Sequence, residues 1–317
     1  MTAAALDELD RAIDRALDTG DESQLDVLGY GEISSVVRWR GRAYKRLPPF
    51  PDADRAGRYG ALVDRYVRAL AARGVAVVDT HVDALARADG SISVYVHQPV
   101  LPADAIGPRA LARWDAAVAA DRFAAIVDAV CAVVGPAPAG EPDGPAARRR
   151  GGDAPGRAAE ASPIGALGLD AQLSNWAWID GRWHYLDVTT PLVRGADGRD
   201  ELDTDLFVAS LPWLLRAPVR RWLLGGILDR YYDPRQVAVD LLANLHKERL
   251  AGRLPSLIEV VNARVSPPVD EAEVARYYRA DARLWAWLLR LRRLDRAWQR
   301  RVRRRRYPFL LPGPIER

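Results

Sequence analysis

Residues 168–175 read Gly168-Leu169-Asp170-Ala171-Gln172-Leu173-Ser174-Asn175, and the strand-like run Trp183-His184-Tyr185-Leu186-Asp187 follows them. Two carboxylates and one carboxamide, those of Asp170, Asn175 and Asp187, thus fall within eighteen residues. Oxygen ligands on short, rigid apolar strands are what a magnesium–phosphate site requires, and a further carboxylate can accept the proton of a hydroxyl. The stretch therefore predicts a metal–phosphate site.

The bulk composition is that of an ordinary soluble protein. The chain has 317 residues, 49% of them hydrophobic and 28% charged, which is enough to build two lobes or two domains. A single cysteine excludes an intramolecular disulfide framework. The N-terminal residues have neither the basic nor the apolar region of a secretory signal. We therefore expect a cytoplasmic protein.

The basic residues are unevenly distributed. Residues 290–306 hold ten arginines and one acid, a net charge of +9 in a chain whose total is +4, so the remainder carries −5. Among the 46 basic residues of the chain only Lys45 and Lys247 are lysines. Because an ammonium group and a guanidinium group are not interchangeable, a lysine in so arginine-rich a chain draws attention to its position.

The first hundred residues predict a helix and then a sheet. Helical spacing of apolar residues predicts an amphipathic helix over 3–18. Residues 25–39 read as strand, glycine turn and strand, with Gly29, Gly31 and Ser34 in or beside the turn, and a third strand carries Lys45. Glycines in such a turn let backbone N–H groups approach a phosphate chain, although a plain hairpin turn has the same pattern.

A second helix and two more strands are expected before residue 101. Residues 56–73 have helical periodicity, and Asp64 lies on this helix. Residues 75–80 and 91–96 read as strands joined by a polar turn. They lead into an extended segment that contains Gln98 and two prolines.

The rest of the chain reads as mostly helical. Helices are expected over 109–134 and, after the strands around Asp187, over 205–216, 218–232, 234–250, 254–264 and about 270–306. Residues 136–163, rich in Pro, Gly, Ala and charge, have no periodicity and predict a flexible insertion.

The last helix alternates tryptophan and leucine with arginine. This pattern suits an anionic membrane surface, an acidic partner or nucleic acid, of which nucleic acid is the least favoured. The plainer alternative, which we favour, is that the apolar stripe packs on the other helices while the arginines are solvated or contact the acidic N-terminal helix. A peripheral membrane location follows only from the first interpretation.

The order of these segments resembles that of the protein-kinase-like superfamily, in the branch of the aminoglycoside and choline phosphotransferases. The likeness covers roughly residues 24–250. It implies an α+β, two-lobed fold with a β-rich N-lobe at 24–101 and a helical C-lobe at 102–317, plus extra helices at 1–23 and at the C-terminus. The local sequence also looks like that of an uncharacterised bacterial family within the superfamily.

The resemblance also implies roles for individual residues. Lys45 would hold the phosphates of ATP under the loop of Gly29, Gly31 and Ser34, and Gln98 would lie at the hinge that meets the adenine. Asn175 and Asp187 would bind Mg²⁺, and Asp170 would accept the proton of the attacking hydroxyl. Gln172 occupies the place of a histidine or lysine, and Asp64 the place of the glutamate that pairs with the lysine.

The groups that brace the site differ from the family pattern. Gly168 replaces a histidine, and Val188-Thr189 follows Asp187 in place of Phe-Gly. The leading hypothesis is an ATP- and Mg²⁺-dependent phosphotransferase acting on a hydroxyl of a small molecule or biosynthetic intermediate. The alternatives are a pseudokinase-like nucleotide-binding or scaffolding module and a peptide Ser/Thr kinase of modified-peptide biosynthesis.

Overall fold

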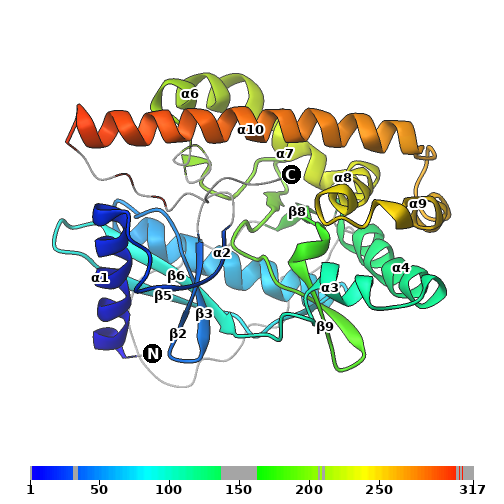
Figure 1. Ribbon diagram of the computed structural model, residues 1–317, viewed down its shortest axis with the longest axis horizontal. Helices are drawn as coiled ribbons and strands as arrows, with labels where there is room; N and C mark the ends of the chain where they lie inside the picture. Colours follow the sequence, from blue (N-terminus) through cyan, green and yellow to red (C-terminus); the bar gives the residue numbers. More distant parts are fainter. Residues whose placement is uncertain are drawn as a thin grey trace.

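The protein is a mixed α+β structure, seen here in a computed structural model. The structure describes residues 2–30, 35–136, 163–205, 208, 211–304, 307 and 309. The first hundred residues form an antiparallel sheet with two helices, and helices dominate the rest (Figure 1). The predictions for Gly31, for Ser34 and for most of the insertion at 136–163 lie outside the described residues.

Five antiparallel strands form the main sheet, in the order β1-β2-β3-β6-β5. Their bounds are Asp26–Tyr30 for β1, Ser35–Trp39 for β2, Arg42–Arg46 for β3, His81–Ala86 for β5 and Ile92–Pro99 for β6. The two-residue turn between β2 and β3, Arg40-Gly41, has φ of 45° and 80°. Two positive φ values match the right-handed twist of paired strands, so this turn fixes the register that aligns Lys45 with Val36. On its other side, β3 pairs with β6, where Lys45 is opposite Val96.

The alternation of side chains gives the sheet two different faces. Tyr44 of β3 and Tyr95 of β6 pack under helix α1 (Ala3–Thr19), whose apolar residues form a cluster with them. Asp10 of α1 is also buried there, where it accepts hydrogen bonds from the Tyr95 hydroxyl at 2.6 Å and from Arg46 at 3.1 Å. The opposite face carries Lys45.

Helix α2 (Ala53–Ala72) begins at Asp52, whose side chain accepts a hydrogen bond from the Arg55 N–H group at 2.7 Å. Its buried face includes Tyr59 and Tyr66, seven residues or about two turns apart, and joins the main core. Asp64 lies on the other side of this helix and is exposed.

The strand expected at 75–80 was wrong in its extent and its partner. Only β4 (Ala76–Val77) forms there, and it pairs in parallel with β10 in a separate sheet of order β4-β10-β9. Val75 and Val78 are buried in the core instead. The strand that forms the hairpin with β6 is β5, which precedes the turn at Gly90. The φ of Gly90 is 84°, which suits a glycine.

The remaining strands flank the residues around Asp170. They are β7 (Gly135–Pro136), β8 (Ile164–Leu167) and β11 (Val193–Gly195) in one small sheet, and β9 (Trp176–Ile179) and β10 (Arg182–Tyr185) beside β4. The hairpin of β9 and β10 closes at Asp180-Gly181, again with two positive φ values, 48° and 77°. It ends two residues before Asp187.

The helices after residue 100 pack mainly on one another. They are α3 (Gly107–Ala112), α4 (Ala116–Val133), α6 (Trp213–Pro218), α7 (Leu224–Asp229), α8 (Pro234–Lys247), α9 (Leu254–Asn262) and α10 (Glu271–Arg301). Short 3-10 turns η3 (Arg230–Tyr232) and η4 (Ala251–Arg253) connect α7 to α8 and α8 to α9, and a third, η1 (Leu173–Asn175), lies between β8 and β9. The helix expected at 218–232 was wrong as one regular element, because residues 219–223 form a π-helical turn, η2 (Val219–Leu223), between α6 and α7.

Helix α10 crosses the molecule from α8 and α9 towards α1 (Figure 1). Asp270 caps it, accepting a hydrogen bond from the Glu273 N–H group at 2.7 Å. Near its end, the Arg300 side chain donates a hydrogen bond to the carbonyl of Leu17 in α1. One arginine of this helix therefore contacts the N-terminal helix, as the plainer sequence interpretation expects.

None of the described helices is long and apolar enough to span a lipid bilayer.

Candidate functional site

A cleft of about 1180 Å³ lies between the main sheet and the later helices. Its walls come from β2, β3, β6, the segment after β6, the loops around Asp170 and Asp187, and helices α8 and α10. The sequence-predicted residues that line it are Gly29, Lys45, Gln98, Asp170, Gln172, Asn175 and Asp187. The cleft is somewhat larger than an ordinary small-molecule pocket.

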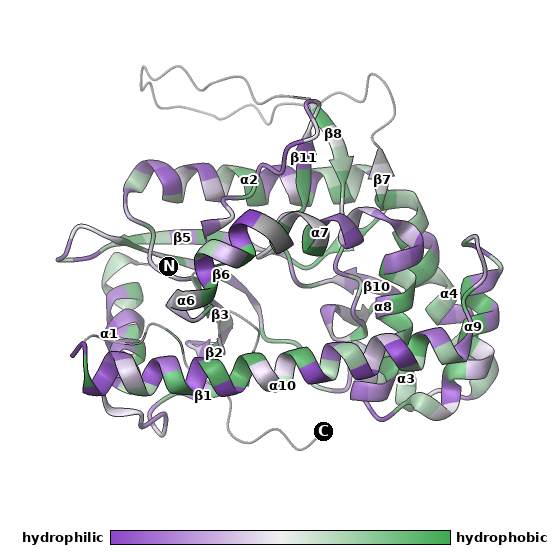
Figure 2. Cartoon of the chain, turned by 90° about the horizontal axis from the view of Figure 1, so that it is seen from above, coloured by the Kyte–Doolittle hydropathy of each residue, from purple (hydrophilic) through white to green (hydrophobic). Residues whose placement is uncertain are grey.

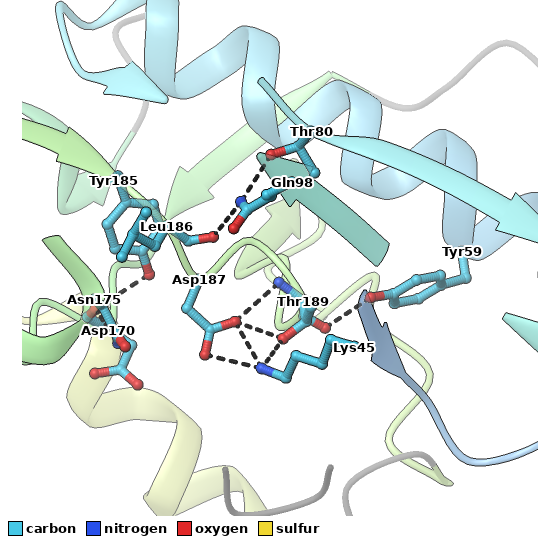
Figure 3. A network of polar contacts seen from close by, with 10 residues as sticks. All are labelled: Lys45, Tyr59, Thr80, Gln98, Asp170, Asn175, Tyr185, Leu186, Asp187 and Thr189. Atoms are coloured by element: carbon cyan, nitrogen blue, oxygen red, sulfur yellow. Dashed lines mark hydrogen bonds and ion pairs between the residues drawn. The ribbon is translucent and has the colours of Figure 1, made fainter. Parts of the chain in front are cut away.

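Lys45, Asp187 and Thr189 form the Lys45 cluster on the sheet side of the cleft (Figure 3). The Lys45 ammonium lies 3.1 and 3.2 Å from the two carboxylate oxygens of Asp187 and donates to the Thr189 hydroxyl at 2.6 Å. The Lys45 and Asp187 side chains are 17% and 29% exposed. Residues 142 positions apart thus meet as a half-buried ion pair.

The Asp187 carboxyl is held in its charged form. Burial works to raise its pKa, but the Lys45 ammonium and hydrogen bonds from the Thr189 hydroxyl and N–H group outweigh burial. The pKa of Asp187 therefore lies below its ordinary value of 3.8. A carboxylate that stays charged at neutral pH suits a ligand for a divalent cation.

Two further hydrogen bonds fix the segment on either side of Asp187. The Tyr59 hydroxyl of α2 donates to the carbonyl of Thr189 at 2.8 Å. The Gln98 amide at the end of β6 donates to the carbonyl of Leu186 at 2.7 Å and to the Thr80 hydroxyl at 2.9 Å. Gln98 therefore joins the main sheet to the Asp187 segment, as Figure 3 shows.

Asp170 and Asn175 lie on the neighbouring loop and are tied to each other through the backbone. The Asn175 Nδ2 group donates to the carbonyl of Asp170 at 3.1 Å, and the Tyr185 hydroxyl donates to the same carbonyl at 3.1 Å. Because the Nδ2 end of the amide is used in this way, Oδ1 is the acceptor that Asn175 can offer to a cation in the cleft. Asp170 Oδ1 accepts from the Gln172 N–H group at 3.3 Å.

The structure explains why position 168 carries no side chain. A Cβ added to Gly168 would lie 2.9 Å from the Tyr231 carbonyl and 3.0 Å from the Leu192 Cβ. The Tyr66 hydroxyl donates to the Gly168 carbonyl at 2.9 Å, and the Leu169 N–H group donates to the Tyr231 carbonyl at 3.1 Å. The backbone of η3 therefore occupies the space that a histidine would need, and the Leu169–Tyr231 hydrogen bond holds it there.

Gln172 faces the helical side of the cleft. Its Oε1 accepts a hydrogen bond from Asn244 of α8 at 3.1 Å, and its side chain also hydrogen-bonds to Asp240. The carboxamide is thus held by α8 and brings no charge to the site.

Asp64 does not join the other predicted residues. It is exposed on α2 and is not among the described residues that line the cleft. The expected pairing with Lys45 fails because the side of α2 that reaches the site carries Tyr59 and Tyr66. The ion-pair partner of the lysine is Asp187 instead.

Sequence reasoning missed Thr189 and Tyr59. Both act through hydrogen bonds between segments far apart in the chain, which no spacing rule detects. The sequence held one signal for Tyr59: with Tyr66, seven residues later, it lies on the apolar face of a predicted helix whose other residues are often charged.

A second polar group, also missed, lies on the helical side of the cleft. Asp240 of α8 and Tyr277 and Asp281 of α10 form this Asp240 cluster. The Tyr277 hydroxyl donates to Asp240 at 2.9 Å and accepts from Arg230 at 2.9 Å. Burial is the largest cause that raises the pKa of Asp240, the nearby Asp281 adds to it, and the hydrogen bond from Tyr277 opposes it.

These features define a mixed α+β protein whose cleft, with polar side chains on both walls, lies between an antiparallel sheet and a set of helices. The chain belongs to a family of unknown function, DUF6206, whose sequence profile matches residues 8–135 and 157–296. Both matched segments contribute to the cleft, the first with Lys45 and the second with Asp170 and Asp187. The comparison with curated proteins found no match.

Proposed function

We propose that the protein is an ATP- and Mg²⁺-dependent phosphotransferase that acts on a hydroxyl, on a two-lobed kinase-like fold. The observation that carries the proposal is the meeting of Lys45, Asp187, Asn175 and Asp170 around one cleft. The acceptor is a small molecule or biosynthetic intermediate, with a peptide Ser or Thr hydroxyl as the alternative.

The arrangement of elements supports the two-lobed interpretation. The five-stranded sheet contributes Lys45 from one side, and the loops and helices after residue 163 contribute the other polar residues. Between them, residues 100–103 follow β6 and line the cleft, where a hinge that meets the adenine would lie.

The chain's own groups suit the binding of a nucleotide. The Lys45 ammonium is positioned by Asp187 and Thr189 and would contact the phosphates of ATP. Asp187 and Asn175 offer the oxygen ligands that Mg²⁺ prefers. Mg²⁺ bound there would supply positive charge against the charge that develops on the transferred phosphoryl group.

Asp170 suits the role of the base. Its carboxylate lines the cleft and accepts a hydrogen bond from the Gln172 N–H group, which limits its orientation. The acceptor oxygen would bond to the γ-phosphorus while the bond from that phosphorus to the bridging oxygen breaks. ADP would leave with the electron pair, and Asp170 would take the hydroxyl proton.

Calorimetric titration with Mg-ATP tests the nucleotide site. We expect Asp187→Asn to weaken binding roughly a hundredfold, because the variant loses a charged ligand and the partner of Lys45. Asp180→Asn is the matched control, since Asp180 is exposed in the β9–β10 turn with φ of 48°, a conformation that asparagine tolerates. Equal binding by the wild type and Asp187→Asn, or no binding by the wild type, would contradict the site.

A second candidate function is nucleotide binding without turnover. It is favoured by Gln172, whose neutral carboxamide is held by Asn244 where the resemblance expects a charged side chain. Asp170→Asn separates the two functions. In a phosphotransferase it should lower ATP turnover about a hundredfold to ten-thousandfold with little change in Mg-ATP affinity, whereas turnover that is unchanged in Asp170→Asn would reject the assigned base.

A further inference from the structure

Helix α10 has two different apolar faces. Its inner face includes Trp285 and Leu289, which line the cleft. Its outer face exposes five large apolar side chains by 48–65% of their surface. These residues form the outer stripe: Leu284, Trp287, Leu294, Trp298 and Val302. Steps of about 100° per residue place all five on one side of the helix. The single stripe expected from the sequence is thus divided between the cleft and the surface.

A row of arginines runs along the outer stripe. At the same angular step, the exposed residues Arg276, Arg279, Arg283 and Arg301 lie beside it on the helix surface. The acids between residues 274 and 304 are Asp281 and Asp295. Asp281 lines the cleft and Asp295 is buried, so neither offsets the positive charge of the outer face.

The described residues after α10 do not cover the outer stripe. Tyr307 lies against Arg292, whose Nε group donates to its hydroxyl at 3.4 Å, and the Arg292 guanidinium lies 5.3 Å from the centre of the Phe309 ring. Arg292 is itself buried and lines the cleft, about 200° around the helix from Leu294. Figure 2 shows hydrophobic and hydrophilic residues alternating along α10. Helices α6 and α7 lie on the same side of the molecule as α10 (Figure 1).

We infer that α10 docks the protein on an anionic lipid surface, with the outer stripe in the interface and the arginines on lipid head groups. Tryptophan and leucine beside arginine are the side chains that partition into this boundary and are attracted to its charge. This inference is independent of the proposed function.

Two other occupants fit the same face less well. A second copy related by a two-fold axis would bring arginines against arginines, a repulsion that no outer acid between residues 274 and 304 offsets. A nucleic acid would pair with the arginines but would leave Leu284, Leu294 and Val302 without an apolar partner.

Flotation with lipid vesicles tests the inference on the full chain. We expect binding to vesicles that contain phosphatidylglycerol, weaker binding as salt rises, and little binding to vesicles of phosphatidylcholine alone. Leu294→Glu and Arg283→Glu should each weaken binding about tenfold or more, because each places a negative charge at the anionic surface. Both side chains are exposed, so the fold should be kept, and circular dichroism checks this.

Arg68→Glu is the matched control, an exposed arginine on α2 whose reversal changes the net charge by the same amount. It should bind like the wild type. Equal losses in Arg68→Glu and Arg283→Glu would mean that net charge alone drives the binding, and would overturn the assignment to α10. Absence of binding to anionic vesicles would also overturn it. So would a Leu294→Glu variant that loses self-association or nucleic-acid binding but still binds vesicles.

Discussion

Asp187 and Asp240 line the same cleft, yet their pKa values move in opposite directions. Burial works to raise both. At Asp187 the Lys45 ammonium and Thr189 outweigh burial and lower the pKa. At Asp240 the hydrogen bond from Tyr277 and the charge of Arg230 do not, and Asp281 adds repulsion, so the pKa rises.

The difference shows that an adjacent cation decides how a buried carboxylate titrates. The Lys45 cluster joins a cation directly to a carboxylate, whereas in the Asp240 cluster Arg230 contacts the carboxylate through the Tyr277 hydroxyl. The pKa of the Asp187 carboxyl on the sheet side is therefore lowered, whereas that of the Asp240 carboxyl on the helical side is raised. Lys45→Met, Thr189→Val and Asp240→Asn test this contrast, and Gly168→Ala tests the packing of the Asp170 loop in the same cleft; the expected effects decrease from Lys45→Met to Asp240→Asn.

Lys45→Met should lower the free energy of unfolding by about 2–3 kcal/mol, because it leaves the Asp187 carboxylate half-buried without its cation. The range is below that of a fully buried pair because both side chains keep some exposure. Urea denaturation measures the change. Lys247→Met, at the other lysine of the chain, is exposed and should change stability by less than about 0.5 kcal/mol.

The same variant has a pH signature. Since the folded pKa of Asp187 is lowered, its contribution to stability is present above the ordinary value of 3.8 and is lost as pH falls through the folded value. Lys45→Met should remove this acid-side loss, so the two stability curves should approach each other at low pH. Parallel curves would mean that Lys45 does not set the pKa of Asp187.

Gly168→Ala should lower the free energy of unfolding by about 1–3 kcal/mol, because its Cβ meets the Tyr231 carbonyl and Leu192. Gly57→Ala is the control, since a Cβ there meets nothing within 4 Å and the position is inside α2. It should be neutral or stabilise by about 0.5–1 kcal/mol. Equal effects of the two changes would contradict the close packing of η3 on the Asp170 loop.

Thr189→Val should cost about 1 kcal/mol, because Lys45 and Asp187 each lose a hydrogen bond to the hydroxyl while the ion pair remains. Because that hydrogen bond helps to lower the Asp187 pKa, an NMR titration of the Asp187 carboxyl should show a higher pKa than in the wild type. An unchanged pKa would remove Thr189 from the Lys45 cluster.

Asp240→Asn should have the smallest effect, of opposite sign at neutral pH. With a raised folded pKa, the folded state holds more protons than the unfolded state above 3.8, so stability falls as pH rises through the folded value. Asparagine resembles the protonated form, and the variant should gain stability at neutral pH and none below 3.8. A thermal-denaturation series over pH measures this, and a loss at neutral pH would contradict the raised pKa.

The sequence predicted helix α1 and helix α2 closely, because apolar periodicity is a local signal. Asp170, Asn175 and Asp187 were readily singled out because few residue types suit a metal, and Lys45 because lysine is rare here. The hairpin partner of β6 was predicted wrongly, because the apolar run at 75–80 has the pattern of a strand but enters the core beside β10. Thr189, Tyr59 and Asp240 depend on contacts between distant segments, and their role cannot be inferred before the fold is known.

Helix α10 also limits how the cleft can open. With 31 residues it is about 46 Å long, and it is anchored on α8 and α9 at one end and on Leu17 of α1 at the other. Such a helix acts as a cross-brace between the sheet and the helical side. A movement of the sheet away from the helices that widened the cleft would stretch or break the Arg300–Leu17 hydrogen bond, a contact far from the polar clusters.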